Sequence, residues 1–514
     1  MSVFTALGLL SCTVALWAVT TSIVKRLSRQ LPLPPGPKPL PIIGNLLDVP
    51  TKAPWATYAK WAEQYGDVMS MTVLGKVMVI LNSSTAVRDL LDKRGSIYSD
   101  RPVVPFTELS GVAHWDLSII RYGEGWRIRR RLMEHSFRPA SIVQYRQMQK
   151  SKVHETLRRL LRNPLDFDSH IKQLSSIVMS IVYGYDVKDH NDRFIQIADA
   201  SNRIGAEANT PGAFLVNDLP FLRYLPGWLP GMRFKAVAQQ SKNIAREMIE
   251  NPFDFVKENM RNGTSRQCFV RENLNKSEKS DETAIAHVAA AIYGAGVHTT
   301  GSTIRTFLLA MALNPDVQQK AQAELDEVLG SAALPDFSDR PRLPYIEAIC
   351  KEVIRWRTIV PLASYTTGVP HATMESDVYG GHLIPKGSVI FANAWSILHD
   401  PAVYPNPDTF NPGRFLEAGG RVLDDSTLSS MFGFGRRICP GRHLADASIW
   451  IFVVSFLSVF NVSDARDVHG NKARHDHPYA DFLVSDAAPF TCYISVRDER
   501  SEGLIVSSAI AEVD

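Results

Sequence analysis

One cysteine in the chain stands in a setting that suits a metal ligand. Cys439 belongs to the string FGFGRRICPG, residues 432–441, and an apolar run typical of a helix follows from about residue 444 to 460. Glycines let a backbone come close to a large flat group and turn N–H groups toward the sulfur. Nearby arginines and the start of a helix favour an anion. We therefore expect Cys439 to be a thiolate and an iron ligand, while Cys350 and Cys492 suit the commoner role of buried free thiols.

A second candidate for chemistry is a pair of threonines in an alanine-rich stretch. Residues 295–300 read AGVHTT, inside a predicted helix from about 281 to 313. Small residues let such a helix pass closely over a flat group, and a threonine hydroxyl can leave the backbone ladder to relay protons. Thr299, Thr300 and His298 are the candidates. Close packing against another helix is the alternative explanation for the alanine and glycine.

Two further strings place arginines where they can meet carboxylates. Glu352 and Arg355 are three residues apart on a predicted helix from 344 to about 357, so they share one face, and Arg414 lies in the later string PGRF. Trp126 and Arg130 begin and end the string WRIRR. A guanidinium binds a carboxylate in bidentate fashion and an indole N–H adds one bond. Each string alone is common and usually belongs to a solvated surface.

Taken together, the strings resemble the signatures of the cytochrome P-450 family. Residues 432–441 match F-x-x-G-x-R-x-C-x-G, and the others match E-x-x-R, P-x-R-F, W-x-x-x-R and (A/G)-G-x-(D/E)-T. The likeness runs from the proline-rich segment near residue 31 to about Arg497. The strings YSDRP (98–102) and YGEGW (122–126) look most like those of fungal members, many of which act in secondary metabolism.

The resemblance implies a role for each matched residue. Cys439 would be the axial ligand of a haem iron, and Glu352, Arg355 and Arg414 would form a structural clamp. Thr299, with His298 or Thr300, would activate oxygen and deliver protons. Residues implied to hold the haem are Phe432, Arg437, Gly441, Trp126, Arg130 and His371.

One position departs from the family pattern. The family has an acid where this chain has His298, directly before Thr299. An imidazole titrates near pH 6.5, so its protonation varies over the working range in a way that a carboxylate's would not. Either His298 takes over proton delivery, or another group does, or the chemistry proceeds with slower protonation.

The elements that must position these residues are predicted to be mostly helices. Helices are expected at 281–313, from Asn314-Pro315 to Gly330, at 344–357 and at 444–460, with two short strands between 378 and 390. Strands are few and not spaced as βαβ units. We expect a mainly α protein with small β-sheets, the cytochrome P-450 fold, over residues 45–497. The polar stretch 263–282 is predicted to be a surface loop, and 498–514 a loosely held tail.

The N-terminal residues predict a membrane anchor. Residues 3–24 carry no charge and as a helix would span about 33 Å, and Lys25, Arg26 and Arg29 follow. A cleaved signal peptide fits less well, because no basic residue precedes the apolar run. The cations predict a single span with the body on the cytosolic side of the endoplasmic reticulum, so that the sequons at Asn82, Asn262, Asn275 and Asn461 stay unglycosylated. Residues 25–44 are predicted to form a stiff hinge.

Composition excludes several classes of protein. The net charge is +3 and 21% of residues are charged, which argues against a nucleic-acid binder. Five scattered cysteines without a CxxC pair argue against a disulfide framework or zinc site.

The expected activity is insertion of one atom of O2 into a lipophilic molecule, with electrons from an NADPH-dependent reductase docking near Arg436 and Arg442. The resemblance implies a substrate pocket lined by residues 106–115, 291, 295, 362–363 and 482–483, for each of which core packing is at least as good an explanation. Two alternatives remain: a haem-thiolate isomerase or dehydratase that needs no external electrons, and a non-catalytic haem or lipid carrier.

Overall fold

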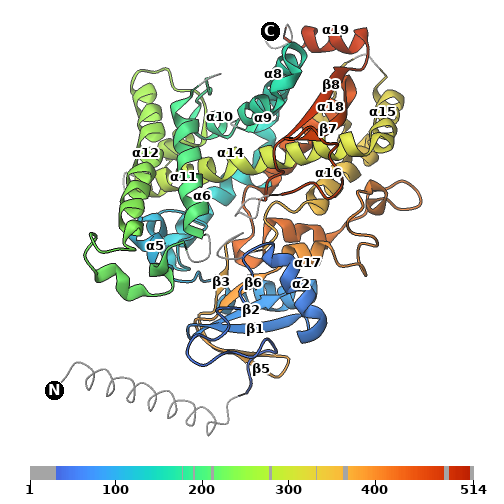
Figure 1. The fold of residues 1–514 in the computed structure, drawn as a ribbon. Helices are drawn as coiled ribbons and strands as arrows, with labels where there is room; N and C mark the ends of the chain where they lie inside the picture. The colour runs from blue at the N-terminus through green and yellow to red at the C-terminus, as the bar shows by residue number, and fades with distance from the viewer. Residues whose placement is uncertain are drawn as a thin grey trace, which may run out of the picture.

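The computed structural model describes residues 31–175, 177–188, 191–209, 213–276, 281–330, 333–362, 369–479 and 485–509. These residues form a mainly helical body with small sheets, as predicted (Figure 1). The expected anchor at 3–24 lies outside the described residues. Among the described helices only the one at Arg442–Val459 is long and apolar enough to cross a membrane, and most of it is buried inside the protein.

Most of the chain is helical. The α-helices are α2 (Pro54–Tyr65), α3 (Ser84–Val87), α4 (Gly95–Tyr98), α5 (Pro105–Leu109), α6 (Glu124–Phe137), α7 (Pro139–Ile142), α8 (Arg146–Arg162), α9 (Phe167–Ser175), α10 (Ile177–Tyr183), α11 (Arg193–Asn209), α12 (Arg233–Arg261), α13 (Phe269–Lys276), α14 (Glu282–Leu313), α15 (Pro315–Leu329), α16 (Pro344–Trp356), α17 (Ala394–Leu398), α18 (Arg442–Val459) and α19 (Glu499–Ser507). Short helical turns include η1 (Arg88–Lys93), η9 (Pro412–Phe415) and η11 (Gly435–Arg437).

The strands form three sheets in the described residues. They are β1 (Val68–Val73), β2 (Lys76–Leu81), β3 (His371–Ala372), β4 (Asp377–Tyr379), β5 (His382–Ile384), β6 (Val389–Ala392), β7 (Phe460–Asp467) and β8 (Phe490–Val496). The largest sheet has the order β1-β2-β6-β3, in which β2 and β6 are parallel. The predicted strand pair at 378–390 is the hairpin β4-β5, and β6 lies beside β2, about 300 residues earlier in the chain, a pairing that local sequence does not reveal.

Helix α14 is the centre of the fold. It crosses the middle of the molecule in Figure 1 and packs against α6, α9, α10, α11, α12, α16 and α18. Its predicted limits are confirmed: Asn314 ends it, and Pro315, whose missing N–H is harmless in a first turn, opens α15. The apolar helix α18, predicted after Cys439, packs beside it in the same core.

Two of the predictions about peripheral segments were wrong, while the stiff hinge stays a prediction. The described part of that hinge is held to the body: the Ser70 amide donates to Pro35 O at 2.8 Å and the Leu383 amide to Pro32 O at 2.8 Å. The supposed loop 263–282 contains α13, because Phe269 and Val270 give a short, otherwise polar segment a fully buried face. The supposed tail contains α19, whose Ile505 is fully buried.

Candidate functional site

Cys439 is held in a loop between η11 and α18. Its amide donates to Phe432 O at 2.7 Å, which closes the loop around the sulfur. The Gly441 α-carbon faces the sulfur, since an added Cβ there would lie 3.9 Å from Cys439 Sγ. A Cβ on Gly435 would lie 2.1 Å from the Leu91 carbonyl oxygen. The Gly435 backbone therefore approaches the protein's own η1 turn, and this glycine needs no flat ligand to explain it.

The surroundings of Cys439 oppose the thiolate more than predicted. Burial raises the pKa of the Cys439 thiol, although the amides of Gly441 and Arg442 and the charges of Arg130 and Arg442 act to lower it. The predicted anion-favouring groups are therefore present, but burial outweighs them. A bound metal ion is the stronger influence on a coordinating thiol and would deprotonate it.

Two of the predicted haem-binding arginines lie against the ring of Trp126. The Arg437 guanidinium carbon is 4.6 Å and that of Arg130 6.0 Å from the ring centroid. Trp126 and Arg130 come from α6, and Arg130 Nη1 donates to Ile438 O, next to the cysteine, at 2.5 Å. All three side chains are buried. The structure thus assembles residues more than 300 positions apart around one loop.

Arg437 has only neutral partners among the described residues. It donates to three backbone carbonyls, those of Ser99 at 2.8 Å, Leu117 at 3.3 Å and Ile120 at 2.9 Å. Burial, with a contribution from the Arg130 charge, lowers the pKa of Arg437 to about 9. The lowered pKa means that the surroundings of Arg437 disfavour the charged form of its guanidinium.

Arg101 belongs to the same cluster and was missed by sequence reasoning. It is buried and donates to the carbonyls of Ser118 at 2.7 Å, Val369 at 3.0 Å and Pro370 at 2.9 Å. Burial, and then the charge of Arg437, lowers its pKa well below the usual value. No local signal in the string YSDRP marks it, because a polar string of this kind does not reveal that its arginine is buried beside Arg437.

His371 completes the cluster from strand β3. Its Nδ1 lies 2.8 Å from Tyr98 O, so Nδ1 carries the proton and donates to that carbonyl. Burial, followed by the charge of Arg101, lowers the pKa of His371 well below its usual value. His371 is therefore neutral at pH 7, and it cannot form the charged pair with a carboxylate that an arginine would.

The donor set of this cluster fits a haem. A partly buried thiol stands beside Arg101 and Arg437, whose hydrogen bonds go to carbonyls, and beside Arg130, which also pairs with Glu134 at 2.7 Å. Asp100 bonds Arg121 and Asp116 bonds Ser118 at 2.7 Å, so neither carboxylate is hydrogen-bonded to Arg101 or Arg437, although the charge of Asp100 acts on both. Such an excess of buried positive charge matches a planar group that carries two carboxylates and needs an axial sulfur.

The threonine predicted on α14 faces accessible space. Ala295 is exposed although it lies mid-helix in the core of the molecule, and the Thr299 hydroxyl donates to Ala295 O at 3.0 Å. Thr300 is partly buried on the same turn. Gly296 faces the other way, where an added Cβ would lie 2.9 Å from Val178 Cγ2. The helix-packing alternative therefore explains Gly296 but not Ala295.

His298 points toward α11. Its Nε2 lies 3.4 Å from Asp199 Oδ1. Burial lowers the pKa of His298, while the Asp199 charge acts to raise it. The structure thus gives the imidazole a carboxylate partner from another helix, which the sequence pattern could not indicate.

Glu352, Arg355 and Arg414 form one buried ionic cluster. Arg355 makes two bonds to the Glu352 carboxylate, at 2.7 and 2.9 Å, and Arg414 Nε donates to it at 3.2 Å. Glu352 and Arg355 are fully buried. The same arginines donate to carbonyls of the segment 398–409. The group ties α16 to η9 and to that segment, in keeping with the predicted structural role.

The predicted substrate-lining residues have mixed surroundings. Residues 363, 482 and 483 lie outside the described residues. Leu362 is fully buried in a cluster with Trp55 and Phe391, and Phe106 stacks on Phe214 with centroids 4.6 Å apart. Both therefore pack in the core. Arg442, predicted to face a reductase, is partly buried and donates to Cys439 O at 3.0 Å, whereas Arg436 is exposed.

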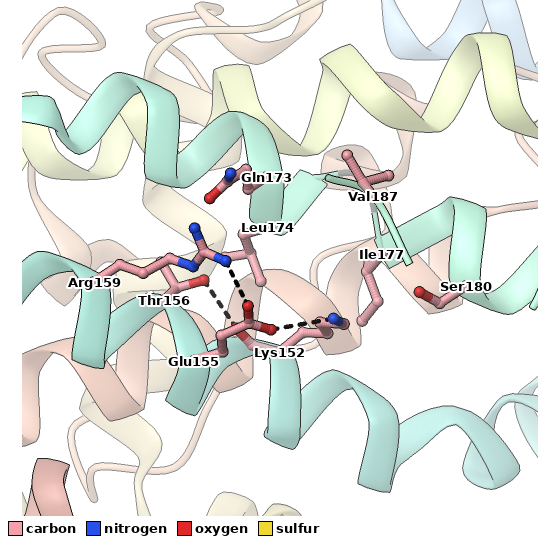
Figure 2. Close-up of a pocket in the computed structure, with 9 residues that line it drawn as sticks. All are labelled: Lys152, Glu155, Thr156, Arg159, Gln173, Leu174, Ile177, Ser180 and Val187. Carbon is pink, nitrogen blue, oxygen red and sulfur yellow. Dashed lines mark hydrogen bonds and ion pairs between the residues drawn. The ribbon is translucent and has the colours of Figure 1, made fainter. Parts of the chain in front are cut away.

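A separate small pocket lies among α8, α9 and α10 (Figure 2). Glu155 stands at its centre and bonds Arg159 at 2.7 Å and Lys152 at 3.1 Å. Since these charges are paired with one another, the pocket offers no free charge to a ligand. It contains none of the predicted site residues.

Comparison with known proteins agrees with this donor set. The cytochrome P-450 family model matches residues 34–485. The cytochrome P-450 monooxygenase COX1 of Coprinopsis cinerea is 38% identical, covering 96% of this chain and 98% of its own. The cytochrome P-450 monooxygenase claR of Ampulloclitocybe clavipes is 38% identical, covering 97% and 91% respectively. The tryptamine 4-monooxygenase of Psilocybe cyanescens is 37% identical, covering 92% and 94%.

Proposed function

The chain belongs to the cytochrome P-450 family of haem-thiolate monooxygenases, and from that premise we propose that it oxidises a lipophilic small molecule of fungal secondary metabolism. One atom of O2 enters the substrate, and electrons come from an NADPH-dependent reductase. The observation that carries the proposal is the partly buried thiol of Cys439 beside the buried arginine cluster of Arg101, Arg130 and Arg437. The relatives, all fungal monooxygenases, support the choice of reaction.

The cofactor supplies the oxygen chemistry when bound, with the axial thiolate favouring O–O cleavage. The residues of this chain hold it and control the protons. Cys439 would hold the iron, and Arg437, Arg130 and Arg101 would hold the propionates, with Trp126 against the guanidiniums of Arg437 and Arg130. Thr299 holds a proton at its hydroxyl on the open face of α14, and Ala295 leaves room beside it for the substrate.

The first experiment replaces the proposed ligand. Cys439→Ala should abolish the thiolate–haem band in the CO difference spectrum of the reduced protein. Cys350→Ala is the control, because Cys350 is a free thiol as well but is buried in the core, and that variant should keep the band. A normal band in Cys439→Ala would refute the ligand assignment.

The second experiment addresses the substrate and the alternatives. The full chain is expressed with a reductase and supplied with terpenoid, polyketide and indole-ethylamine substrates, and the products are identified by mass spectrometry. A product that requires NADPH and reductase supports monooxygenation. A product formed without them would favour the isomerase or dehydratase, and no product in any case would favour the carrier.

We also propose an endoplasmic reticulum location with the body in the cytosol, anchored by residues 3–24. Among the predicted sequons, Asn262 and Asn275 are exposed, whereas Asn82 is buried and bonds Asn393 at 2.8 Å. The two exposed sites therefore report topology best. A glycan on either would place the body in the lumen and refute the proposal.

A further inference from the structure

A buried contact between an imidazole and a carboxylate lies beside Thr299. His298 Nε2 and Asp199 Oδ1 are within ion-pair distance, 3.4 Å apart, and neither atom has a hydrogen-bond partner among the described residues. Both atoms are shielded from solvent, although the side chains they belong to are about 30% exposed. Two polar atoms that are shielded from solvent and face each other form a specific pair rather than a chance surface contact.

The pair is part of a chain of charges on one side of α14. Lys172, from α9, binds the second Asp199 oxygen at 2.5 Å and is 46% exposed. Asp486, before β8, also acts on His298 and is itself bound by Arg305 of α14 at 3.0 Å, which also contacts Asp168 of α9 at 3.1 Å. These groups lead from solvent, through Lys172 and Asp199, to the imidazole.

Thr299 lies next to this pair on α14. Successive residues of an α-helix are turned by about 100°, so His298 and Thr299 occupy adjacent faces. His298 faces α11, and the Thr299 hydroxyl lies toward exposed Ala295. The imidazole therefore stands between the solvent-connected charges and the face on which Thr299 holds a proton.

We propose that Asp199 of α11 takes the place of the carboxylate that α14 lacks, by holding His298 as the proton donor to the Thr299 side. The inference rests on the proposed monooxygenase function. Asp199 is a positioning residue: its carboxylate accepts the Nε2–H, which leaves Nδ1 to exchange protons. His298 takes up one proton from water at Nδ1 and releases it by way of the Thr299 hydroxyl. Only N–H and O–H bonds change, and each cycle leaves both residues as they began.

The first test measures the pKa of the His298 imidazole directly. In holoenzyme labelled with ¹³C-histidine, the His298 signal is assigned by its loss in His298→Asn and followed through a pH titration. Asp199→Asn should lower the pKa of His298 by about one unit, because it removes an opposite charge within 4 Å. Lys172→Met should raise the pKa of His298, because it removes a like charge that acts to lower that pKa. Glu247→Gln, at an exposed carboxylate on α12, is the control and should change nothing.

Activity supplies the second measurement. NADPH consumption by the holoenzyme with reductase, without added substrate, is recorded against pH. Because His298 must be protonated to donate, its pKa sets the alkaline-side midpoint; Asp199→Asn should move that midpoint down with the His298 pKa, and Asp199→Glu should restore the wild-type profile. An unchanged His298 titration in Asp199→Asn, or a shifted titration with an unchanged profile, would overturn the proposal. A wild type that consumes no NADPH would instead overturn the proposed function, and the titration would still decide whether the pair exists.

Discussion

Two buried groups of arginines in this protein differ in what lies at their centre. Around α16, Arg355 and Arg414 both contact the Glu352 carboxylate. Beside the cysteine loop, the side-chain hydrogen bonds of Arg101 and Arg437 within the described residues all go to backbone carbonyls, and Arg437 also lies on the Trp126 ring. The first group satisfies its charge internally and stabilises the fold. The second group holds buried cations that form no ion pair with its own residues. Such a group is typical of a site where an anionic ligand completes the structure.

The largest expected effect comes from removing the central carboxylate. Glu352→Gln leaves two buried guanidiniums without their counter-ion, which should destabilise the protein by about 3–5 kcal/mol. The free energy of unfolding is measured by urea titration. Glu417→Gln, in the exposed pair with Arg421, is the control and should have no measurable effect. Equal stabilities of the two variants would contradict the structural role of Glu352.

An intermediate effect should appear as a pH dependence near the same group. His399 stacks on Trp395, and burial, with the Arg355 charge, lowers its pKa to about 3. The unfolded chain binds a proton here below about pH 6.5 while the folded protein stays neutral, so stability is complete above pH 6.5 and falls toward pH 3.

Between pH 7 and 4 the wild type should therefore lose about 3 kcal/mol more than His399→Phe. Urea unfolding at the two pH values measures the difference. A change at the exposed His135 should leave the wild-type slope unaltered. Identical slopes for the wild type and His399→Phe would show that His399 is protonated in the folded state.

The smallest expected effect separates the two groups most sharply. Arg437→Gln should speed transfer of haem to apomyoglobin at least tenfold, about 1.4 kcal/mol, while the chain without haem unfolds at nearly the wild-type urea concentration. Arg414→Gln should leave the rate of haem transfer near the wild-type value and should lower the urea concentration at which the chain without haem unfolds. If both variants lost stability and kept haem equally well, the distinction between the groups would fail.

Much of the site could be predicted because its residues fall in short local strings. Cys439, Glu352, Arg355 and the limits of α14 and α15 follow from spacing, capping and proline placement. Asp199 and Arg101 could not be found in this way, because their importance comes from contacts across 99 and 336 residues, to His298 and Arg437. The burial that raises the pKa of the Cys439 thiol could not be predicted for a related reason: helix ends and arginines are visible in sequence, but the extent of burial is not.

The open face at Ala295 bears on how this protein can change over time. A residue whose side chain faces the proposed substrate space can change in size without opening a cavity in the packed core or overfilling it. Gly296, one position later, has no such freedom, because Val178 already fills the space. Mutations that adapt the enzyme to a new substrate can therefore accumulate along one side of α14 at little cost in stability. The side of α14 that carries Gly296 stays packed against Val178 and preserves the fold while the substrate preference changes.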